Sequence, residues 1–408
     1  MKRSATKIAW LIWAAMMIAV VASTATLFFT SHGQQRWVTE EEYARVKRYA
    51  RLDEVRKTLM NEYYQPLDEE KLLTGAIRGM TGAVGDVYTF YYTPEEMARE
   101  NEDSAGRYQG IGIQVERTRE GRIEIVRIYP GTPSEQVGLM TGDEIVTVDG
   151  EEVRADTVAL YMEGVRRMRG PADTEVRLGI LRGTRTLEYT VARSAISISY
   201  ADYQLIDGDI GYVAITQFTG DASARFDEAL AFFKEQNISS MVIDLRNNPG
   251  GLLNEVNRIA DRILPKGVIV FVKDRQGTRT DYYSTEDYYD VPVVVLVNGM
   301  SASASEILAA SVQALGRGTV VGVTTYGKGV VQTMTTFPED GAGMQYTTAN
   351  YFDANGRSIN GVGVTPDVEV PLEAERIPAE PDPAHDNQLA KALEILRDAS
   401  VMHVTNST

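Results

Sequence analysis

The spacing of hydrophobic residues divides the chain into segments with different structural signals. Residues 8–30 are almost continuously apolar, whereas residues 39–97 repeat apolar positions at helical spacing, which predicts one or two amphipathic helices. From residue 108 to residue 193, short alternating strands are separated by glycine turns. From residue 207 to residue 372, strands and helices alternate, which predicts a layered α/β domain.

The N-terminal apolar run predicts a membrane anchor or a signal peptide. Residues 8–35 contain no Asp, Glu, Lys or Arg, and residues 8–30 are long enough for a helix to cross a bilayer of about 30 Å. Basic residues precede the run and an acidic cluster follows it, so we expect the body of the chain on the extracytoplasmic side. Small residues near Ala25 are also typical of a cleavage site, and loss of residues 1–25 or so would give a secreted protein. We favour a single-pass anchor in the cell membrane because the apolar run continues through Phe29.

The glycine-rich segment contains predicted strands of alternating apolar and polar residues. They cover residues 110–115, 123–128, 144–148 and 176–180. Asp149-Gly150 predicts a tight hairpin turn. In the first strand, Gly110 and Gly112 permit another backbone to approach closely, while Ile111 and Ile113 are suited to line an apolar pocket. Taken alone, the pattern also fits a small structural barrel that binds nothing.

The α/β segment combines buried strands with amphipathic helices. The predicted strands cover residues 210–215, 241–245 and 291–297, and the predicted helices cover 222–236, a stretch ending at residue 263, and 305–315. Beyond residue 372 come acidic residues and prolines, then an apolar helix over residues 389–396. The expected organisation is a cytoplasmic tip with the anchor or signal peptide (1–35), a helical region (36–100), a β-domain (104–195), an α/β core (196–375) and a tail with a helix (376–408).

Composition excludes several classes of function. The 408 residues include 41 Lys and Arg against 57 Asp and Glu, a net charge of −16, which disfavours a nucleic-acid-binding surface. Because the chain has no Cys, it has no disulfide, no thiolate nucleophile and no thiolate metal site. The 3 histidines are His32, His385 and His403, so the long span between the first two cannot hold a Ser-His-Asp triad or a His-ligated zinc.

A serine and a lysine in the α/β segment are candidates for catalysis without imidazole. Ser303 lies where a strand leads into a helix, whose N-terminus favours a developing anion, although an isolated serine-rich turn is more often a helix cap. Lys328 lies between two glycines before a predicted strand, and Gln332 shares its face if that strand is regular from its start. A lone lysine is more often a solvated surface residue. Lysine is a base only when neutral, so burial must lower its pKa from about 10.4 toward about 7–8.

Two glycine-rich turns add further candidate chemistry. One contains Gly250 and Gly251 after a buried strand, where exposed backbone N–H groups are suited to bind an oxyanion. The other, Gly322–Gly329, has the spacing of a phosphate-binding P-loop. However, Gly329 occupies the position of the Ser or Thr that would hold Mg²⁺, and a strand follows instead of a helix. Nucleotide binding is therefore a remote alternative.

These motifs resemble a known protease family. The order of Gly-Ile-Gly-Ile at 110–113, Pro-Gly-Thr-Pro at 130–133 and Gly-Asp-Glu-Ile at 142–145 resembles a PDZ domain. The chain from about residue 52 to residue 367 resembles the carboxyl-terminal processing peptidases, Ser-Lys serine proteases with an embedded PDZ domain. It is most similar to the bacterial exported or membrane-anchored members. The resemblance also covers the motifs Gly85–Tyr92 and Gly361–Asp367, and in the latter Val362-Gly-Val364 replaces a more usual isoleucine-containing run.

The resemblance implies a serine endopeptidase whose core is related to the crotonase and Clp-protease architecture of strand-strand-helix units. In it, Ser303 would be the nucleophile, Lys328 the general base and Gln332 the residue that orients Lys328. The N–H groups of Ala304 and of either Gly250 or Gly251 would form the oxyanion hole. No metal or cofactor is implied by this chemistry.

The resemblance also implies how substrates bind. A PDZ domain takes the C-terminal carboxylate of a peptide on backbone N–H groups, and the peptide adds as a strand. Gly110, Ile111, Gly112 and Ile113 are therefore expected to bind the C-terminal tails of protein or peptide substrates. A catalytically silent PDZ scaffold is the alternative. The expected partners are such substrates, the membrane through residues 8–30, and a second copy of the chain in a homodimer, but no nucleic acid.

Overall fold

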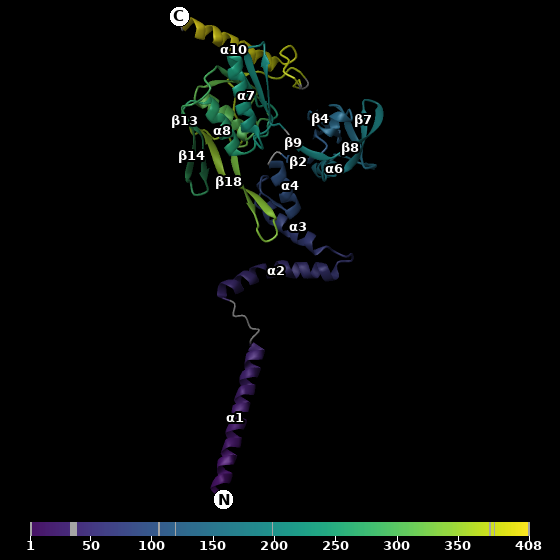
Figure 1. The fold of residues 1–408 in the computed structure, drawn as a ribbon, viewed down its shortest axis with the longest axis vertical. Helices are drawn as coiled ribbons and strands as arrows, with labels where there is room; N and C mark the ends of the chain where they lie inside the picture. The colour runs from purple at the N-terminus through teal and green to yellow at the C-terminus, as the bar shows by residue number, and fades with distance from the viewer. Residues whose placement is uncertain are drawn as a thin grey trace. The chain divides into compact units, whose positions relative to one another are not determined.

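The computed structural model describes residues 2–32, 39–104, 107–118, 120–197, 199–374, 377–378 and 380–406 (Figure 1). The chain divides into two compact units, Met1–Gly79 and Met80–Thr408. The expected α/β class with an inserted β-domain and N-terminal helices is confirmed by this arrangement of elements.

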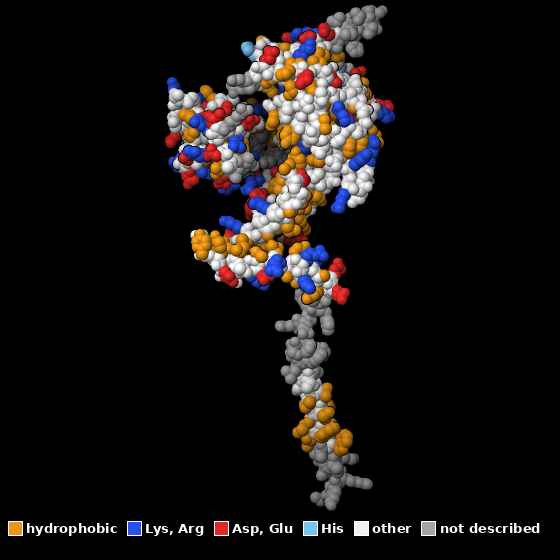
Figure 2. All heavy atoms as spheres, turned by 180° about the vertical axis from the view of Figure 1, so that it is seen from behind, with side chains coloured by type: hydrophobic (Ala, Val, Ile, Leu, Met, Phe, Trp, Pro, Cys, Tyr) orange, Lys and Arg blue, Asp and Glu red, His pale blue; other side chains and the backbone are white. Residues whose placement is uncertain are grey.

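The first unit is helical, as the spacing of apolar residues predicts. It contains α1 (Lys2–His32), α2 (Glu40–Glu62) and most of α3 (Glu69–Gly82). Along α2, the apolar side chains of Tyr43, Val46, Tyr49 and Leu52 are 47% to 64% exposed. Figure 2 shows hydrophobic side chains, in orange, at the surface of this helix. Apart from the half-buried Arg56, every described side chain of α2 is exposed. This helix therefore keeps an apolar stripe that its own unit does not cover.

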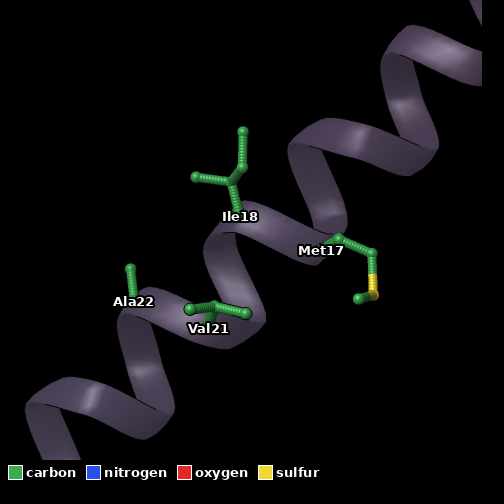
Figure 3. Close-up of a pocket in the computed structure, with 4 residues that line it drawn as sticks. All are labelled: Met17, Ile18, Val21 and Ala22. Carbon is green, nitrogen blue, oxygen red and sulfur yellow. The ribbon is translucent and has the colours of Figure 1, made fainter.

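The structure contradicts the membrane anchor expected at residues 8–30, and with it the placement of the chain in the cell membrane. Residues 2–32 do form one helix, but no helix among the described residues combines the length and the apolar character that crossing a membrane requires. A hollow on this helix is lined by Met17, Ile18, Val21 and Ala22 (Figure 3). These four side chains carry no group that does acid–base or nucleophilic chemistry.

The second unit contains an antiparallel β-domain where the glycine-rich pattern predicts one. Its elements are β2 (Arg107–Gly110), β3 (Ile113–Arg117), β4 (Ile123–Ile128), α5 (Pro133–Gln136), β5 (Glu144–Val148), β6 (Glu151–Glu152), α6 (Val158–Met168), β7 (Glu175–Arg182), β8 (Arg185–Ala192) and β9 (Ser194–Ser197). The strand order β3-β4-β5-β7-β8 leaves β3 at an edge of the sheet. Asp149 and Gly150 join β5 to β6 with φ angles of 53° and 83°, which confirms the predicted tight turn.

A mostly parallel sheet forms the centre of the second unit. Its order is β10 (Ala201–Ile206), β11 (Ile210–Ile215), β12 (Ser240–Asp244), β15 (Val293–Val297), β16 (Gly318–Gly322) and β19 (Val368–Glu369), and only the β10–β11 pair is antiparallel. The helices are α7 (Ala222–Gln236), α8 (Leu253–Ile263), α9 (Ala304–Ala314) and α10 (Asn387–Asn406). The strands and helices expected between residues 210 and 315 are thereby confirmed, with boundaries shifted by at most two residues.

Alternation along the central strands creates two apolar layers. Val213, Ile243 and Val295 belong to the core that contains α7, α8 and α9, whereas their neighbours Val242 and Leu296 belong to the core that contains α10. Full burial of such a side chain stabilises the fold by roughly 1.5–3 kcal/mol. The sheet is therefore covered on both faces, which suits its continuous β-branched strands.

A second sheet lies beside the helix that follows Ser303. It contains β1 (Phe90–Tyr92), β13 (Gly267–Asp274), β14 (Arg279–Ser284), β17 (Val330–Thr336) and β18 (Gly343–Asp353), and α4 (Pro94–Ser104) follows β1. The long strand β18 pairs with β1, β13 and β17. Residues from the start of the second unit are thus brought to β18, the strand with which β17, the strand after Lys328, also pairs.

A buried ion cluster connects α10 to the central sheet. Arg246, two residues after the end of β12, contacts Asp244 at 2.5 Å and Asp386 at 2.8 Å. Burial opposes its charge, but the two carboxylates raise the pKa of Arg246 above its ordinary value. Asp386 also accepts the N–H groups of Gln388 and Leu389, so it caps the first turn of α10. One carboxylate therefore holds both a buried cation and a helix N-terminus.

Replacing Asp386 by Ala should destabilise the second unit strongly. The change leaves Arg246 with one buried carboxylate fewer and removes a helix cap, and such losses cost about 3–5 kcal/mol. Urea unfolding of the full chain, followed by far-UV circular dichroism, measures the loss as a lower midpoint.

The matched control is Asp382→Ala on the same segment. Asp382 pairs with His385 at 2.6 Å, but both side chains are largely exposed, so this change should leave the midpoint nearly unaltered. Equal midpoints for the two variants would mean that the buried cluster contributes nothing special to stability.

Candidate active site

Ser303 lies at the junction of β15 and α9 in an unusual backbone conformation. Its φ of 56° and ψ of −113° fall where non-glycine residues are rarely found, at a cost of about 1–3 kcal/mol. The neighbouring Ser301 and Ser305 are buried, and their hydroxyls donate to the carbonyls of Leu245 and Asn248 at 2.8 and 2.9 Å. Ser303 is only half-buried, so among these three serines it is the one that the fold leaves accessible.

The carboxylate of Glu306 joins the serine turn to the lysine segment. This side chain in the first turn of α9 is 0% exposed. Its Oε2 accepts the backbone N–H groups of Ser303 and Lys328, both at 2.8 Å. Its Oε1 accepts the Thr325 hydroxyl at 2.6 Å and the Gly327 N–H at 2.7 Å. Four donors therefore compensate one buried charge and hold two distant segments of the chain together.

Tyr351 from β18 makes a second connection between the same segments. Its hydroxyl lies 3.1 Å from the carbonyl oxygen of Ser303, to which it donates, and also contacts that of Lys328. The side chain is 1% exposed. Burial, together with the charge of Glu306, raises the pKa of Tyr351 well above its ordinary value, so the hydroxyl stays protonated and remains a donor.

Lys328 places its amine against an aromatic ring. Its Nζ lies 4.5 Å from the centre of the Tyr88 ring. Burial lowers the pKa of Lys328 below its ordinary value, while the charges of Asp86 and Glu306 act in the opposite direction. Within the described residues, no hydrogen bond connects this amine to the Ser303 hydroxyl. The two groups are thus held in one region by their backbones, with the lysine side chain resting on Tyr88.

Lys328 and Gln332 do not lie in one regular strand, so strand alternation does not place their side chains on the same face. β17 begins at Val330, after the lysine, and a bulge interrupts its pairing with β18 between Val331 and Gln332. The Gln332 amide nitrogen lies 3.4 Å from the Thr347 hydroxyl and 3.5 Å from the Val330 carbonyl. The shared face was expected only if the strand is regular from Lys328 onward, but β17 begins two residues after the lysine. The extra residue of the bulge, Thr348, lies in the partner strand β18.

The candidate oxyanion-hole groups lie around Ser303. A Cβ on Gly250 would lie 2.7 Å from the Ser303 Cβ and 2.9 Å from the Ala304 nitrogen, so this position requires glycine. The Gly250 N–H donates to the Asn248 side chain at 2.8 Å. Gly251 also lies close to another part of the backbone, because a Cβ there would lie 2.2 Å from the carbonyl oxygen of Phe218. Both glycines therefore permit tight packing of their turn.

The alternation of apolar residues predicted one strand through the Gly-Ile-Gly-Ile segment of the β-domain. That prediction is wrong, because the segment forms a turn between two strands. β2 ends at Gly110 and β3 begins at Ile113. Gly112 has a φ of 86°, and a Cβ there would lie 2.2 Å from Thr132. Ile111 is 3% exposed and belongs to the domain core, so it does not line an open pocket. Ile113 starts the edge strand.

Sequence reasoning missed several residues around Ser303 and Lys328. Ser303-x-x-Glu306 has the form of a capping box, and this signal was present in the sequence. Asp86 and Tyr88 lie within the motif Gly85–Tyr92, but their position beside Lys328 depends on pairing of β1 with β18. For possible metal sites, no group of at least 3 His, Asp or Glu side chains suited to hold a metal gathers among the described residues.

Family models match three successive parts of the chain. Residues 12–96 match the activating protease CtpB N-terminal domain, residues 109–192 match the PDZ domain, and residues 209–370 match peptidase family S41. The first match overlaps the N-terminal helices, the second the antiparallel β-domain, and the third the two sheets with Ser303 and Lys328.

Known proteins with similar sequences are proteases. The carboxy-terminal-processing protease of Bartonella bacilliformis is 34% identical over 346 residues, which cover 82% of this chain and 78% of that protein. The carboxyl-terminal-processing protease of Synechocystis is 36% identical over 363 residues, which cover 86% and 83%. Among solved structures, the photosystem II D1 C-terminal processing protease is similar with a TM-score of 0.55 and 27% identity, over 82% of this chain and 94% of that one.

The matched models and relatives agree with the architecture described above. The relatives are similar over most of their own length and not over one module. The P-loop alternative is also excluded by the elements, since Gly322 ends one strand and Val330 begins another, with no helix between them. The chain therefore belongs to the carboxyl-terminal processing proteases, serine-type peptidases of family S41 that carry a PDZ domain.

Proposed function

We propose that the protein is an endopeptidase that captures C-terminal tails with its PDZ domain and cleaves peptide bonds with Ser303 and Lys328. The observation that supports this most is the Glu306 carboxylate, which accepts the N–H groups of both residues at 2.8 Å. A structural role alone does not require a strained, half-buried serine at this place. No other hydroxyl in that turn is accessible, because Ser301 and Ser305 are buried and bonded.

The reaction we propose proceeds through an acyl-enzyme. Neutral Lys328 Nζ takes the Ser303 Oγ proton as that oxygen attacks the carbonyl carbon of a peptide bond. The carbonyl oxygen becomes an oxyanion, and the C–N bond breaks as the lysine ammonium gives its proton to the leaving amine. Water then attacks the carbonyl carbon of the Ser303 ester while Lys328 takes a proton from the water. The bond between that carbon and Ser303 Oγ breaks, the acid product is released, and the lysine ammonium returns the proton to Oγ. No step requires a metal or a cofactor.

Backbone N–H groups would bind the oxyanion. Ala304 is the first residue of α9, where N–H groups have no partner within the helix. As the second donor we propose Gly251, because the N–H of Gly250 already donates to Asn248. The close packing of Gly250 against Ser303 then serves to bring that turn next to the nucleophile.

The lysine must leave Tyr88 in order to act as the base. A cation over an aromatic ring is stabilised, so the resting position favours the protonated amine. Burial has the opposite effect and lowers the pKa of Lys328. Below that pKa the base is protonated, so kcat/KM should fall as the pH is lowered and rise toward a plateau at higher pH.

Ser303→Ala and Lys328→Ala should each abolish cleavage of a disordered reporter protein with an apolar C-terminal tail. Loss of a nucleophile or its base costs on the order of a thousandfold or more in kcat. The full chain is assayed by gel densitometry across a pH series.

Lys273→Ala is the matched control, because Lys273 also places its amine over a ring, that of Phe352 at 5.1 Å. It should cleave at the wild-type rate. Cleavage by Ser303→Ala or Lys328→Ala at that same rate contradicts the Ser-Lys assignment. So does a kcat/KM of the wild-type protein that does not fall as the pH is lowered.

The PDZ domain offers an edge strand for tail binding. β3 pairs only with β4 in its sheet, so its other edge is open to an added strand. The preceding turn depends on Gly112, where a side chain would clash with Thr132. We propose that this turn takes the terminal carboxylate of the substrate.

Gly112→Ala should weaken binding of a fluorescent apolar peptide with a free C-terminus by about tenfold or more, since a distorted turn misplaces the N–H donors. Anisotropy with the full chain carrying Ser303→Ala measures this without cleavage. Amidating the peptide should weaken binding to a similar extent.

Gly183→Ala provides the control. Gly183 also has a positive φ, of 63°, in the same domain, but a Cβ there meets nothing within 4 Å. Equal affinity for the free and the amidated peptide would contradict carboxylate capture. Tight binding together with an inactive wild-type enzyme would instead support the scaffold alternative.

A homodimer through the N-terminal helices and residues 386–400 stays a prediction, although Leu389, Leu393 and Leu396 of α10 pack in the core of their own chain. Its basis is the exposed apolar stripe of α2, including Tyr43, Val46 and Tyr49, which a second copy of the chain would cover. Light scattering on the full chain decides between a monomeric and a dimeric mass.

A further inference from the structure

Asp86 lies in the turn before β1 and accepts three hydrogen bonds. Its Oδ1 accepts the Tyr88 N–H at 3.0 Å, and its Oδ2 accepts the hydroxyls of Thr89 and Thr347, each at 2.6 Å. Burial acts to raise the pKa of Asp86, but these hydrogen bonds outweigh it and lower the pKa below its ordinary value. The side chain is therefore a carboxylate at neutral pH, and a carboxylate can only accept.

This carboxylate determines the direction of the next hydrogen bond. A threonine hydroxyl has one hydrogen, and Thr347 donates it to Asp86, so the Thr347 oxygen can only accept from a further partner. That partner is the Gln332 amide nitrogen at 3.4 Å, which also lies 3.5 Å from the Val330 carbonyl. Both neighbours are acceptors. The NH₂ end of Gln332 therefore faces them, and its carbonyl oxygen Oε1 remains for a donor.

We propose that Asp86 is a positioning residue for the reaction: through Thr347 it orients the Gln332 amide so that Oε1 receives an N–H of Lys328. The inference rests on the Ser-Lys function proposed above. A neutral lysine amine has two N–H bonds and one lone pair, and the lone pair must face Ser303 Oγ. Donation of one N–H to a fixed Oε1 restricts rotation of the amine, whereas an NH₂ group in that place would offer the amine no acceptor.

The topology brings these groups together from two consecutive strands and one segment far from them in the chain. Gln332 in β17 and Thr347 in β18 are direct partners across the strands, while β1 pairs with the same strand β18 and positions the turn of Asp86. Tyr88, in that turn, carries the ring on which the Lys328 amine rests at 4.5 Å. The 86–88 turn thus contacts the lysine in its resting position and, through Thr347, orients the amide that receives the lysine when it moves.

Thr347→Val tests the relay, the chain of hydrogen bonds from Asp86 through Thr347 to Gln332, because it removes the Thr347 hydroxyl and leaves the Asp86 charge in place. We expect kcat on the disordered reporter protein to fall about tenfold with KM within about twofold, since one orienting hydrogen bond is lost. Thr347→Ser, which restores the hydroxyl, should return kcat to within about threefold of wild type. Asp86→Asn should also lower kcat by about tenfold or more, because its NH₂ group can donate to Thr347 and reverse the order of donors.

Thr348→Val is the matched control in the same pair of strands. The Thr348 hydroxyl lies 2.9 Å from that of Thr333 and takes no part in the relay, so the variant should keep the wild-type kcat. Equal losses in the Thr347 and Thr348 variants, or an unaltered kcat in Thr347→Val, overturn the relay. If Ser303→Ala and Lys328→Ala are inactive in the same assay, that outcome leaves the Ser-Lys function intact. If Lys328→Ala still cleaves, the proposed function itself fails.

Discussion

The buried carboxylate of Glu306 is the interaction on which the rest of this site depends. It is 0% exposed and accepts four hydrogen bonds, two of them from the N–H groups of Ser303 and Lys328. A charge in such a position is costly unless every oxygen is compensated, so each donor is required to stay in place. These hydrogen bonds hold the serine turn and the lysine segment together, although the chain between them contains a helix and a strand.

Each of the two sheets positions one part of this site. The central sheet delivers Ser303 at the end of β15, and burial of alternate residues against α7 to α9 and against α10 fixes that strand on both faces. The second sheet delivers Lys328 before β17, and Tyr351 of β18 contacts the carbonyls of both residues. At Lys328, burial lowers the pKa while Asp86 and Glu306 raise it. The same carboxylates that organise the site therefore also limit how far the base is activated.

Most elements of the central sheet were predictable because their signals are local. α7 covers Ala222–Gln236 as expected, since its amphipathic spacing and the flanking turns lie in one window. β8, over Arg185–Ala192, escaped prediction because its outward positions are polar and its strand signal is weak. The bulge beside Gln332 depends on how β17 pairs with β18, and the meeting of Asp86 with Thr347 depends on contact between segments far apart in the chain. No local pattern contains that information, whereas the Ser303-x-x-Glu306 capping box does appear in the sequence.

The role of Glu306 is tested most directly by kcat/KM of the Glu306→Gln variant, with thermal unfolding recorded on the same sample. The substituted amide offers one acceptor oxygen in place of two, so two of the four donors lose their partner, and we predict a loss of about a hundredfold or more. Glu255→Gln is the comparison, because Glu255 is also buried and accepts the Ser223 N–H at 3.1 Å on another helix. It should keep activity close to wild type. A folded Glu306→Gln protein with kcat/KM within twofold of wild type would contradict the claim that this carboxylate assembles the site.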